Sequence, residues 1–573
     1  MKRNLIRATV LIAVAGLGLS ACEKTLEVTN PNSGDTQRVL GTATDAENLV
    51  GGYYKRSLAG LYGQGLTDVE GMTGVMSFMN FSSLANNCLN NHLSFSGADN
   101  YNTVGNTCKA EQLTGYAIQN EVQRVASSFL AQVDAGLDLQ TTARKQRDQA
   151  FAEFLRGVSI GYIALFYDST AVISTKTDGQ DPGKLVGYRE AMDSAVAALQ
   201  RAIDYSNAPS TGVGGFPLPA TWIPSPTATT PGYTAAEFVK LIRTYRAKFQ
   251  SSVARTPTER AAAPWAAITA DAQAGISTDF QITTSNSTTT GSGVRYNWRA
   301  QYDAASTWHQ MPPFIIGMGD VSGNYQSWLN TALNSRGAGN NGFFMVTPDL
   351  RFPQGATRTA QQADFALTSC TAAGSVCKRY FVNRPSGDNF TGSGWGWSNY
   401  DIARFHSWRI SGDGGTGQLG NTPLITKVEN DMMAAEGMIR TGNYAGAAAL
   451  INVSRVRNGL PPITAFDNTT PVPGGNPGCV PNVPNSSGTG TACGNLMEAM
   501  KWEKRIEDAY TNLGVWFIDM RGWGDLAKDT PLYWATPYDD ILARGLGAGR
   551  LYGVGIGVGD AANSAAAKGT YGW

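Results

Sequence analysis

Flat aromatic rings next to side-chain amides occur in three stretches of this 573-residue chain. Trp395, Trp397 and Tyr400 stand in FTGSGWGWSNYD, Tyr101 and Asn102 in GADNYNTVGN, and Trp308 in STWHQM. Sugars present apolar C–H faces ringed by hydroxyls, which rings and amides can contact together. Around Trp395 and Trp397 the glycines offer no packing surface, and alternate residues of an extended chain share a face. We predict that these six residues supply the surfaces of an exposed ligand-binding cleft.

Two alternatives to a ligand face stay open from the sequence. Large aromatic residues dominate buried cores, so each ring could instead anchor its own loop. Aromatic residues are also enriched at protein interfaces, so the same surface could meet a partner protein.

Catalysis is the competing class of function, and its signals are weak. Gly157, Ser159 and Gly161 fit G-x-S-x-G, but that motif needs a strand, a sharp turn and a helix, whereas here it lies inside a helical apolar pattern. The three histidines lack zinc-ligand spacing, and no phosphate-binding loop occurs. A pair such as Asp539 and Asp540 does not define the separation that glycoside hydrolysis requires. We therefore predict no enzyme, no cofactor and no metal site, with a secreted glycoside-processing enzyme as the alternative.

The N-terminus predicts export and a lipid anchor. Lys2, Arg3 and Arg7 precede an apolar run that is too short to cross a bilayer, followed by LSAC. This order resembles the lipobox of bacterial lipoproteins, in which the cysteine, here Cys22, carries the lipid. Without residues 1–21 the chain has 42 basic and 45 acidic residues, a charge near −3, and no basic run for nucleic acid.

The six remaining cysteines fall into three sequence-local pairs. Disulfides persist in the extracytoplasmic space that the N-terminus predicts. We predict the pairs Cys88–Cys108, Cys370–Cys377 and Cys479–Cys493, because CxxC and Cys/His metal spacings are absent.

Apolar residues at helical spacing, with breakers at the ends, predict the elements that must position these residues. The expected helices are 45–61, 116–135, 142–166, 188–205, 235–253, 264–274, 426–440, 444–457 and 496–510. Gly459 and the prolines at 461 and 462 are expected to stop the helix 444–457. Paired helices with alanine-rich contacts are typical of stacked tetratricopeptide-like hairpins. The long stretches 206–233, 277–421 and 461–494 are expected to be non-helical.

Three blocks resemble the SusD/RagB family of outer-membrane nutrient-binding lipoproteins. CEKTLEVTNPN with TDAENLVGGYYKR resembles the family's start behind the lipid cysteine. TPLITKVENDMMAAEGMIRTGNYAGAAALINVSRVRNGLP resembles its two helices that end in Arg-x-Arg-x-Gly-Leu, with Arg455, Arg457, Gly459 and Leu460 in place. WEKRIEDAYTNLGVWFIDMRGWGDL resembles its last block, although Val515-Trp516 departs from the family's Glu-Gly-x-Arg. In these blocks Glu503, Arg505, Asp519 and Arg521 are expected to tie helix ends together.

The resemblance implies a mainly α fold: a tetratricopeptide-like helical-hairpin scaffold with long irregular loops and minor β structure. It implies one domain over 22–573, with the scaffold mainly in 36–275 and 422–530 and a loop-rich insertion at about 277–421. By resemblance, the protein would be anchored in the outer membrane by its lipid, facing the cell exterior. There it would capture an oligosaccharide, or alternatively a peptide or another nutrient, for a SusC-like TonB-dependent barrel.

Overall fold

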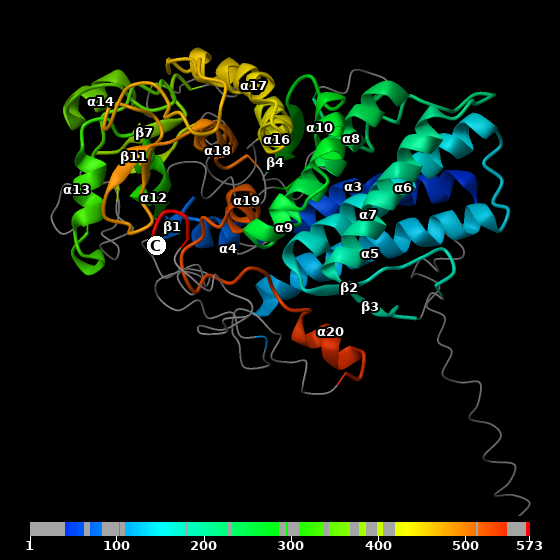
Figure 1. Cartoon of the computed structure of the whole chain (residues 1–573). Coiled ribbons are helices and arrows are strands. Elements are labelled where there is room, and N and C mark those ends of the chain that lie inside the picture. Colours follow the sequence, from blue (N-terminus) through cyan, green and yellow to red (C-terminus); the bar gives the residue numbers. More distant parts are fainter. Residues whose placement is uncertain are drawn as a thin grey trace, which may run out of the picture.

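Figure 1 shows the computed structural model of the chain. The residues that it describes are 41–61, 69–82, 102, 109–177, 181–226, 232–285, 294–295, 309–336, 343–366, 369, 377–385, 398–404, 419–511, 514–546 and 569–573. Residues 1–21, Cys22 and the predicted pair Cys88–Cys108 lie outside this set.

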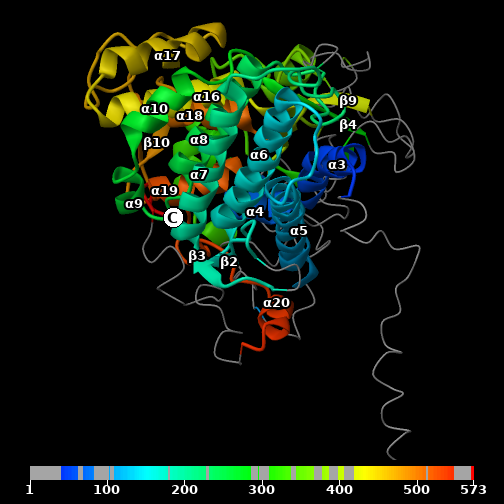
Figure 2. The same cartoon turned by 90° about the vertical axis from the view of Figure 1, so that its right-hand side faces the viewer.

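Most of the described chain is helical, as the sequence predicts. The main helices are α3 (Ala43–Leu61), α5 (Lys109–Asp134), α6 (Thr142–Phe166), α7 (Tyr188–Asn207), α8 (Ala235–Ser252), α10 (Trp265–Gln273), α16 (Lys427–Arg440), α17 (Tyr444–Arg457) and α18 (Leu496–Asp508). Each overlaps a predicted helix. Helices that follow one another pack side by side: α5 on α6, α6 on α7, α7 on α8, and α16 on α17 (Figures 1 and 2). This arrangement is a scaffold of stacked helical hairpins.

Local signals in the sequence set the ends of several helices. The Thr141 hydroxyl accepts the Arg144 N–H at the start of α6, and the Thr426 hydroxyl accepts the Glu429 N–H at the start of α16. After α17 the chain turns through Gly459, whose φ is 78°, a left-handed conformation that glycine adopts without steric cost. The predicted stop at Gly459 is therefore confirmed.

The expectation that 277–421 lacks helices is wrong. Among its described residues are the short helices α12 (Pro313–Ile316), α13 (Asn324–Asn330) and α14 (Arg358–Asp364). Elsewhere, the sequence pattern also did not predict α4 (Val69–Met76), α9 (Pro257–Ala261), α19 (Val515–Trp523) and α20 (Tyr538–Ala543). These helices are too short to show a repeated apolar period, which is the signal that predicts longer ones.

Strands are few and short in the described residues. One sheet has the order β5 (Val294–Arg295), β4 (Phe280–Ser285), β9 (Leu419–Ile425). Two-stranded sheets pair β1 (Phe81–Ser82) with β6 (His309–Gln310), β2 (Ser169–Ala171) with β3 (Leu185–Gly187), β7 (Phe381–Asn383) with β8 (Tyr400–Ile402), and β10 (Asn482–Pro484) with β11 (Thr491–Cys493). Antiparallel pairing of β4 with β9 places Phe280 opposite Ile425. The chain therefore leaves and rejoins the helical scaffold at one place, on either side of the long 277–421 region.

The G-x-S-x-G stretch is a helix-packing motif in this structure. Its three residues lie inside α6, and the Ser159 hydroxyl donates to the Leu155 carbonyl one turn earlier at 2.7 Å. A Cβ added at Gly157 would lie 2.6 Å from the Leu199 side chain of α7, and one at Gly161 would lie 2.3 Å from the Phe249 ring of α8. The glycines let α7 and α8 approach α6 closely, so this serine has no exposed elbow from which to act as a nucleophile.

Alanine at Gly161 is expected to destabilise the protein, whereas alanine at Gly52 is expected to stabilise it. Both glycines are helical, but a Cβ at Gly52 would meet nothing within 4 Å. Replacing a helical glycine by alanine contributes about 0.5–1 kcal/mol where space is free, and overpacking costs about 1–3 kcal/mol where it is not. Denaturant titration of the two variants should show opposite signs; equal shifts would contradict the close α6–α8 packing.

Charged residues of the α18–α19 region join helices, as the sequence predicts. Asp519 of α19 pairs with Lys504 of α18 at 2.6 Å and with Arg260 of α9 at 3.0 Å. Arg521 donates to the Ser252 carbonyl at the end of α8 at 3.0 Å. Glu503 and Arg505 instead tie α18 to connecting segments: Glu503 contacts Arg351 at 3.1 Å, and Arg505 pairs with Asp525. All four are buried and engaged with protein partners.

One predicted disulfide is present among the described residues. Cys479 and Cys493 are bonded, with their Cα atoms 5.6 Å apart, and the bond closes the segment that carries β10 and β11. Cys377 is also disulfide-bonded, and its predicted partner Cys370 lies outside the described residues. No described helix combines the length and apolar character needed to cross a membrane.

Candidate ligand-binding site

Four of the six predicted ligand residues lie outside the described part of the chain. These are Trp395, Trp397, Tyr101 and Trp308, so their proposed role stays a prediction.

The prediction is wrong for Tyr400, which is a core residue. Its side chain is 0% exposed. The hydroxyl donates to the Gln361 side chain at 2.8 Å and lies 3.2 Å from the Met345 carbonyl. Its position in β8, a strand whose three residues are all buried, turns the ring inward. Tyr400 therefore fixes the base of its loop and offers no surface to a ligand.

The prediction is also wrong for Asn102, which has a structural role. Its side chain is buried; the amide N–H donates to the Thr536 carbonyl at 2.9 Å, and the amide oxygen accepts the Tyr538 N–H at 2.8 Å. Since Tyr538 is the first residue of α20, the Asn102 side chain holds the start of that helix. Both ends of the amide bond to protein groups and the side chain is buried, so it offers no exposed surface to a sugar.

The described residues beside Trp308 and Trp397 nevertheless lie together. His309 of β6 pairs with Ser82 of β1. Two residues further on, the Met311 N–H donates to the Tyr400 carbonyl at 2.9 Å, and the Ser398 hydroxyl donates to the Met311 carbonyl at 2.6 Å. One small patch therefore contains Ser82, His309 and Ser398, which stand at the ends of three described ranges that are far apart in the sequence. We call this patch the loop-anchor patch.

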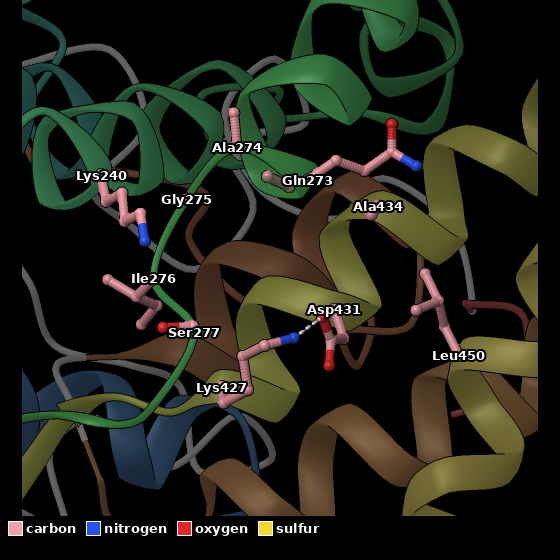
Figure 3. A pocket seen from close by; sticks show the side chains of 11 residues that line it. Lys240, Gln273, Ala274, Gly275, Ile276, Ser277, Lys427, Asp431, Ala434 and Leu450 are labelled. Atoms are coloured by element: carbon pink, nitrogen blue, oxygen red, sulfur yellow. Dashed lines mark hydrogen bonds and ion pairs between the residues drawn. The ribbon is translucent and has the colours of Figure 1, made fainter. Parts of the chain in front are cut away.

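A surface pocket of about 410 Å³ lies where α8, α10, α16 and α17 approach one another. Its lining residues are Lys240, Ala272, Gln273, Ala274, Gly275, Ile276, Ser277, Lys427, Asp431, Ala434 and Leu450. Figure 3 shows that the strip 273–277, which leads from α10 toward β4, crosses between the α8 and α16 sides of the pocket. Lys240 extends its ammonium group toward this strip, and Lys427 faces Asp431 on the α16 side.

A buried polar network holds the strip in place. The Thr244 hydroxyl accepts the Ile276 N–H at 2.9 Å and donates to the Asn430 side chain at 3.2 Å. The Asn430 amide in turn donates to the Ala272 carbonyl at 2.7 Å. A Cβ at Gly275 would lie 2.4 Å from the Thr244 hydroxyl oxygen, so only glycine lets the chain pass this close. The back wall of the pocket is thus rigid and built from three helices.

Several polar groups of the pocket have no hydrogen bond to the described protein. Lys240, Gln273 and Ser277 are exposed, and their side chains make no hydrogen bond or ion pair in the described structure. Lys427 is paired with Asp431 one turn along α16. Ile276 and Leu450, both half-buried, supply apolar surface. The arrangement can present donors, acceptors and a small apolar floor to one ligand.

A second, smaller pocket of about 200 Å³ adjoins the first and shares Lys240, Ile276 and Ser277 with it. On its far side are Tyr233, which is half-buried, and Glu237. Hydrogen bonds from the Thr234 hydroxyl and backbone N–H hold the pKa of Glu237 below its usual value, and the nearby charge of Lys240 acts in the same direction. Glu237 is therefore ionised at neutral pH, and its carboxylate is turned toward Thr234 at the start of α8.

Sequence reasoning missed this double pocket. Its residues come from four helices, the segment before α8 and the chain from the end of α10 to the start of β4, and no local motif relates Lys240 to Ser277 or Leu450. The stop after α10 at Gly275 was the one available signal, and it indicates a chain turn without indicating a cavity. Within the described ranges, no group of three or more His, Cys, Asp or Glu side chains could hold a metal ion.

The similarity of this chain to known proteins lies in its fold and not in its sequence. No protein-family model and no curated protein matches the chain. The crystal structure of a SusD-like carbohydrate binding protein from Bacteroides fragilis NCTC 9343 aligns with a TM-score of 0.52 and 13% identity, over 91% of this chain and 94% of that one. A SusD homolog from Bacteroides thetaiotaomicron VPI-5482 aligns with a TM-score of 0.51 and 13% identity, over 92% and 93%.

The chain is therefore a tetratricopeptide-like helical protein elaborated by long connecting regions. Within that class, it has the SusD-like fold, and the resemblance of its sequence blocks to the SusD/RagB family is confirmed at the level of the fold.

Proposed function

We propose that this protein is a lipid-anchored nutrient-binding protein of the cell surface, which captures an oligosaccharide and delivers it to a SusC-like TonB-dependent transporter. The observation that carries the proposal is the shared fold, which extends over more than nine tenths of this chain and of the two similar structures. One of those structures is described as a carbohydrate binding protein. The N-terminal sequence adds the anchor at Cys22, because two or more acyl chains suffice for stable attachment.

The loop-anchor patch supports the position of the ligand face. Two residues of this patch, His309 and Ser398, directly follow Trp308 and Trp397 in the sequence. The proposed binding face combines Trp308, Trp395 and Trp397, whereas Tyr101 precedes Asn102, which is bonded to the start of α20, and stays a separate prediction.

The double variant Trp395→Ala/Trp397→Ala is expected to lose most of its glycan affinity while keeping its thermal midpoint. Truncation of an anchoring aromatic residue typically costs about 2 kcal/mol or more, a loss of about thirtyfold in affinity. Affinity electrophoresis against a panel of plant and microbial polysaccharides measures this loss, and calorimetry measures the midpoint.

Phe466→Ala is the matched control, because Phe466 is also an exposed ring, 58% accessible, but lies on the stretch before the disulfide segment. It should bind as the wild type does. Tyr400→Ala should instead lower the midpoint, since that ring is buried. Wild-type affinity in the double variant would remove the two tryptophans from the site. Failure of the intact chain to retain any polysaccharide would contradict glycan capture, and peptide binding in the same assay would favour the alternative ligand.

A further inference from the structure

We infer that the double pocket between α8, α10, α16 and α17 is a second binding site, which takes a short uncharged glycan with one sugar unit in each of its two halves. The inference rests on the proposed function, because it assigns the same class of ligand to a different place on the molecule. All the residues that carry it are described, and none belongs to the loop-anchor patch.

Shape is the first argument. The two halves, of about 410 and 200 Å³, adjoin along the shared residues Lys240, Ile276 and Ser277. A ligand of two linked units would therefore lie across these residues, with one unit on each side. The wall between and behind the units is held by the buried Thr244–Asn430 hydrogen bonds, so the pocket is present before any ligand arrives. A preformed pocket lowers the cost of ordering on binding.

Hydrogen-bonding capacity is the second argument. The Lys240 ammonium has three donors, and the Ser277 hydroxyl can donate and accept. Both groups line both halves of the pocket and make no hydrogen bond within the described structure. Hydroxyl groups of a sugar are the ligand atoms that satisfy such a mixed set. The apolar surfaces of Ile276 and Leu450 in the larger half, and the half-buried Tyr233 ring in the smaller half, suit the C–H faces of the two units.

Charge is the third argument, and it disfavours an anionic ligand. Lys427 pairs with Asp431, and Lys240, which makes no ion pair in the described structure, lies one turn from Glu237 on the same helix. The remaining carboxylate, Asp279, accepts the Lys427 N–H at the start of α16 at 2.7 Å. The two halves together are lined by two lysines and three carboxylates, a net charge of −1, which disfavours a carboxylated or sulfated sugar. Uncharged hydroxyls, in contrast, form strong hydrogen bonds to charged groups without displacing the Lys427–Asp431 pair.

The test uses saturation-transfer NMR on the mature chain with maltose, cellobiose and lactose as neutral probes and glucuronate as the charged probe. At the ligand efficiency usual for small ligands, a disaccharide is expected to bind with a Kd of about 1 mM or below. To separate the two sites, the titration is made in the Trp395→Ala/Trp397→Ala background, where signal from the proposed loop face is lost. We expect one or more disaccharides to bind there, more tightly than their methyl monosaccharides, and glucuronate not to bind.

Adding Lys240→Met and Ser277→Ala is expected to weaken disaccharide binding about tenfold, because hydrogen bonds to a charged group and to a hydroxyl are both removed. Both residues are exposed, so the thermal midpoint should not change. Lys184→Met is the matched control. Lys184 is also exposed, makes no side-chain hydrogen bond or ion pair in the described structure, and precedes β3 at the opposite end of the scaffold (Figure 1).

The outcomes separate this inference from the proposed function. Unchanged disaccharide binding after Lys240→Met/Ser277→Ala, with polysaccharide retention intact in the wild type, would overturn the second site and leave glycan capture standing. Absence of disaccharide binding in the Trp395→Ala/Trp397→Ala background would overturn it in the same way. Disaccharide binding that depends on Lys240, in a chain that retains no polysaccharide, would support the pocket and contradict capture of long glycans.

Discussion

Arg260→Ala is expected to lower the free energy of unfolding by about 3–5 kcal/mol, the usual cost of removing one partner from a buried ion pair. The Arg260 guanidinium is fully buried and donates to both carboxylate oxygens of Glu436, at 2.8 and 2.6 Å. It also pairs with Asp519 at 3.0 Å. Because Asp519 binds Lys504 as well, this cluster joins α9, α16, α18 and α19. The variant would leave two carboxylates buried with less compensation, and urea titration measures the loss.

The same cluster predicts acid sensitivity. Burial by itself would raise the pKa of Glu436, but the charge and hydrogen bonds of Arg260 outweigh burial and bring the pKa down from 4.5 to about 2. A carboxyl group with a lowered folded-state pKa stabilises the fold above its unfolded pKa and loses that contribution as the pH falls toward the folded value. Stability from Glu436 should therefore be complete above about pH 5 and decline between pH 4.5 and pH 2, and Arg260→Ala should flatten this decline.

Arg440→Ala is the control for this cluster. Arg440 pairs with the same carboxylate, Glu436, at 2.8 Å, but its side chain is 21% exposed. Partial exposure reduces the value of an ion pair, so we expect a loss of about 1 kcal/mol or less. Equal losses in the two variants would show that burial is not what makes Arg260 important.

Arg351→Ala is expected to have an effect of similar size and to act first on the attachment of the 277–421 region. Arg351 donates to both oxygens of Asp349, at 2.9 and 2.6 Å, and contacts Glu503 at 3.1 Å and Glu507 at 3.3 Å on α18. Without the guanidinium, three buried carboxylates would lose the cation that they share, which again costs about 3–5 kcal/mol. Relative to the wild type, the rate of amide hydrogen exchange should increase more in 343–352 than in α6, because the lost contacts lie between this stretch and α18.

Arg457→Ala tests the same site from its exposed edge. Arg457 also pairs with Glu507, at 2.7 Å, but half of its side chain is in solvent. Exposed pairs contribute about 0.2–1 kcal/mol, so this variant should stay near wild-type stability. A loss as large as that of Arg351→Ala would mean that Glu507, rather than the buried arginine, organises the contact.

Long helices were predictable because their signals are local. The capping threonines at 141 and 426 and the glycine at 459 act on neighbouring residues, and the apolar spacing of α6, α7 and α16 shows which residues belong to one helix. The Cys479–Cys493 bond was predictable for the same reason, since its partners are close in sequence within one polar loop. Short helices such as α13 and α14 carry no such repeated pattern.

The roles of the polar and aromatic loop residues were less predictable. Tyr400 and Asn102 stand in glycine- and asparagine-rich stretches that look exposed in sequence, yet each is buried by partners far along the chain: Met345 and Gln361 for Tyr400, and Thr536 and Tyr538 for Asn102. An aromatic or amide side chain satisfies a buried site as well as a ligand. Composition alone therefore could not separate the two roles.

By itself, the sequence determined the long helices, the stop of α17 at Gly459, the local disulfide and the structural character of the charged residues in α18 and α19, because periodicity, helix-stop residues and short separations operate along the chain. Only the tertiary structure decided that 277–421 begins and ends side by side at β4 and β9, that Tyr400 faces inward, and that Lys240 and Ser277 share a pocket. Those outcomes depend on which distant segments pack together, and packing between distant segments leaves no period in a single sequence.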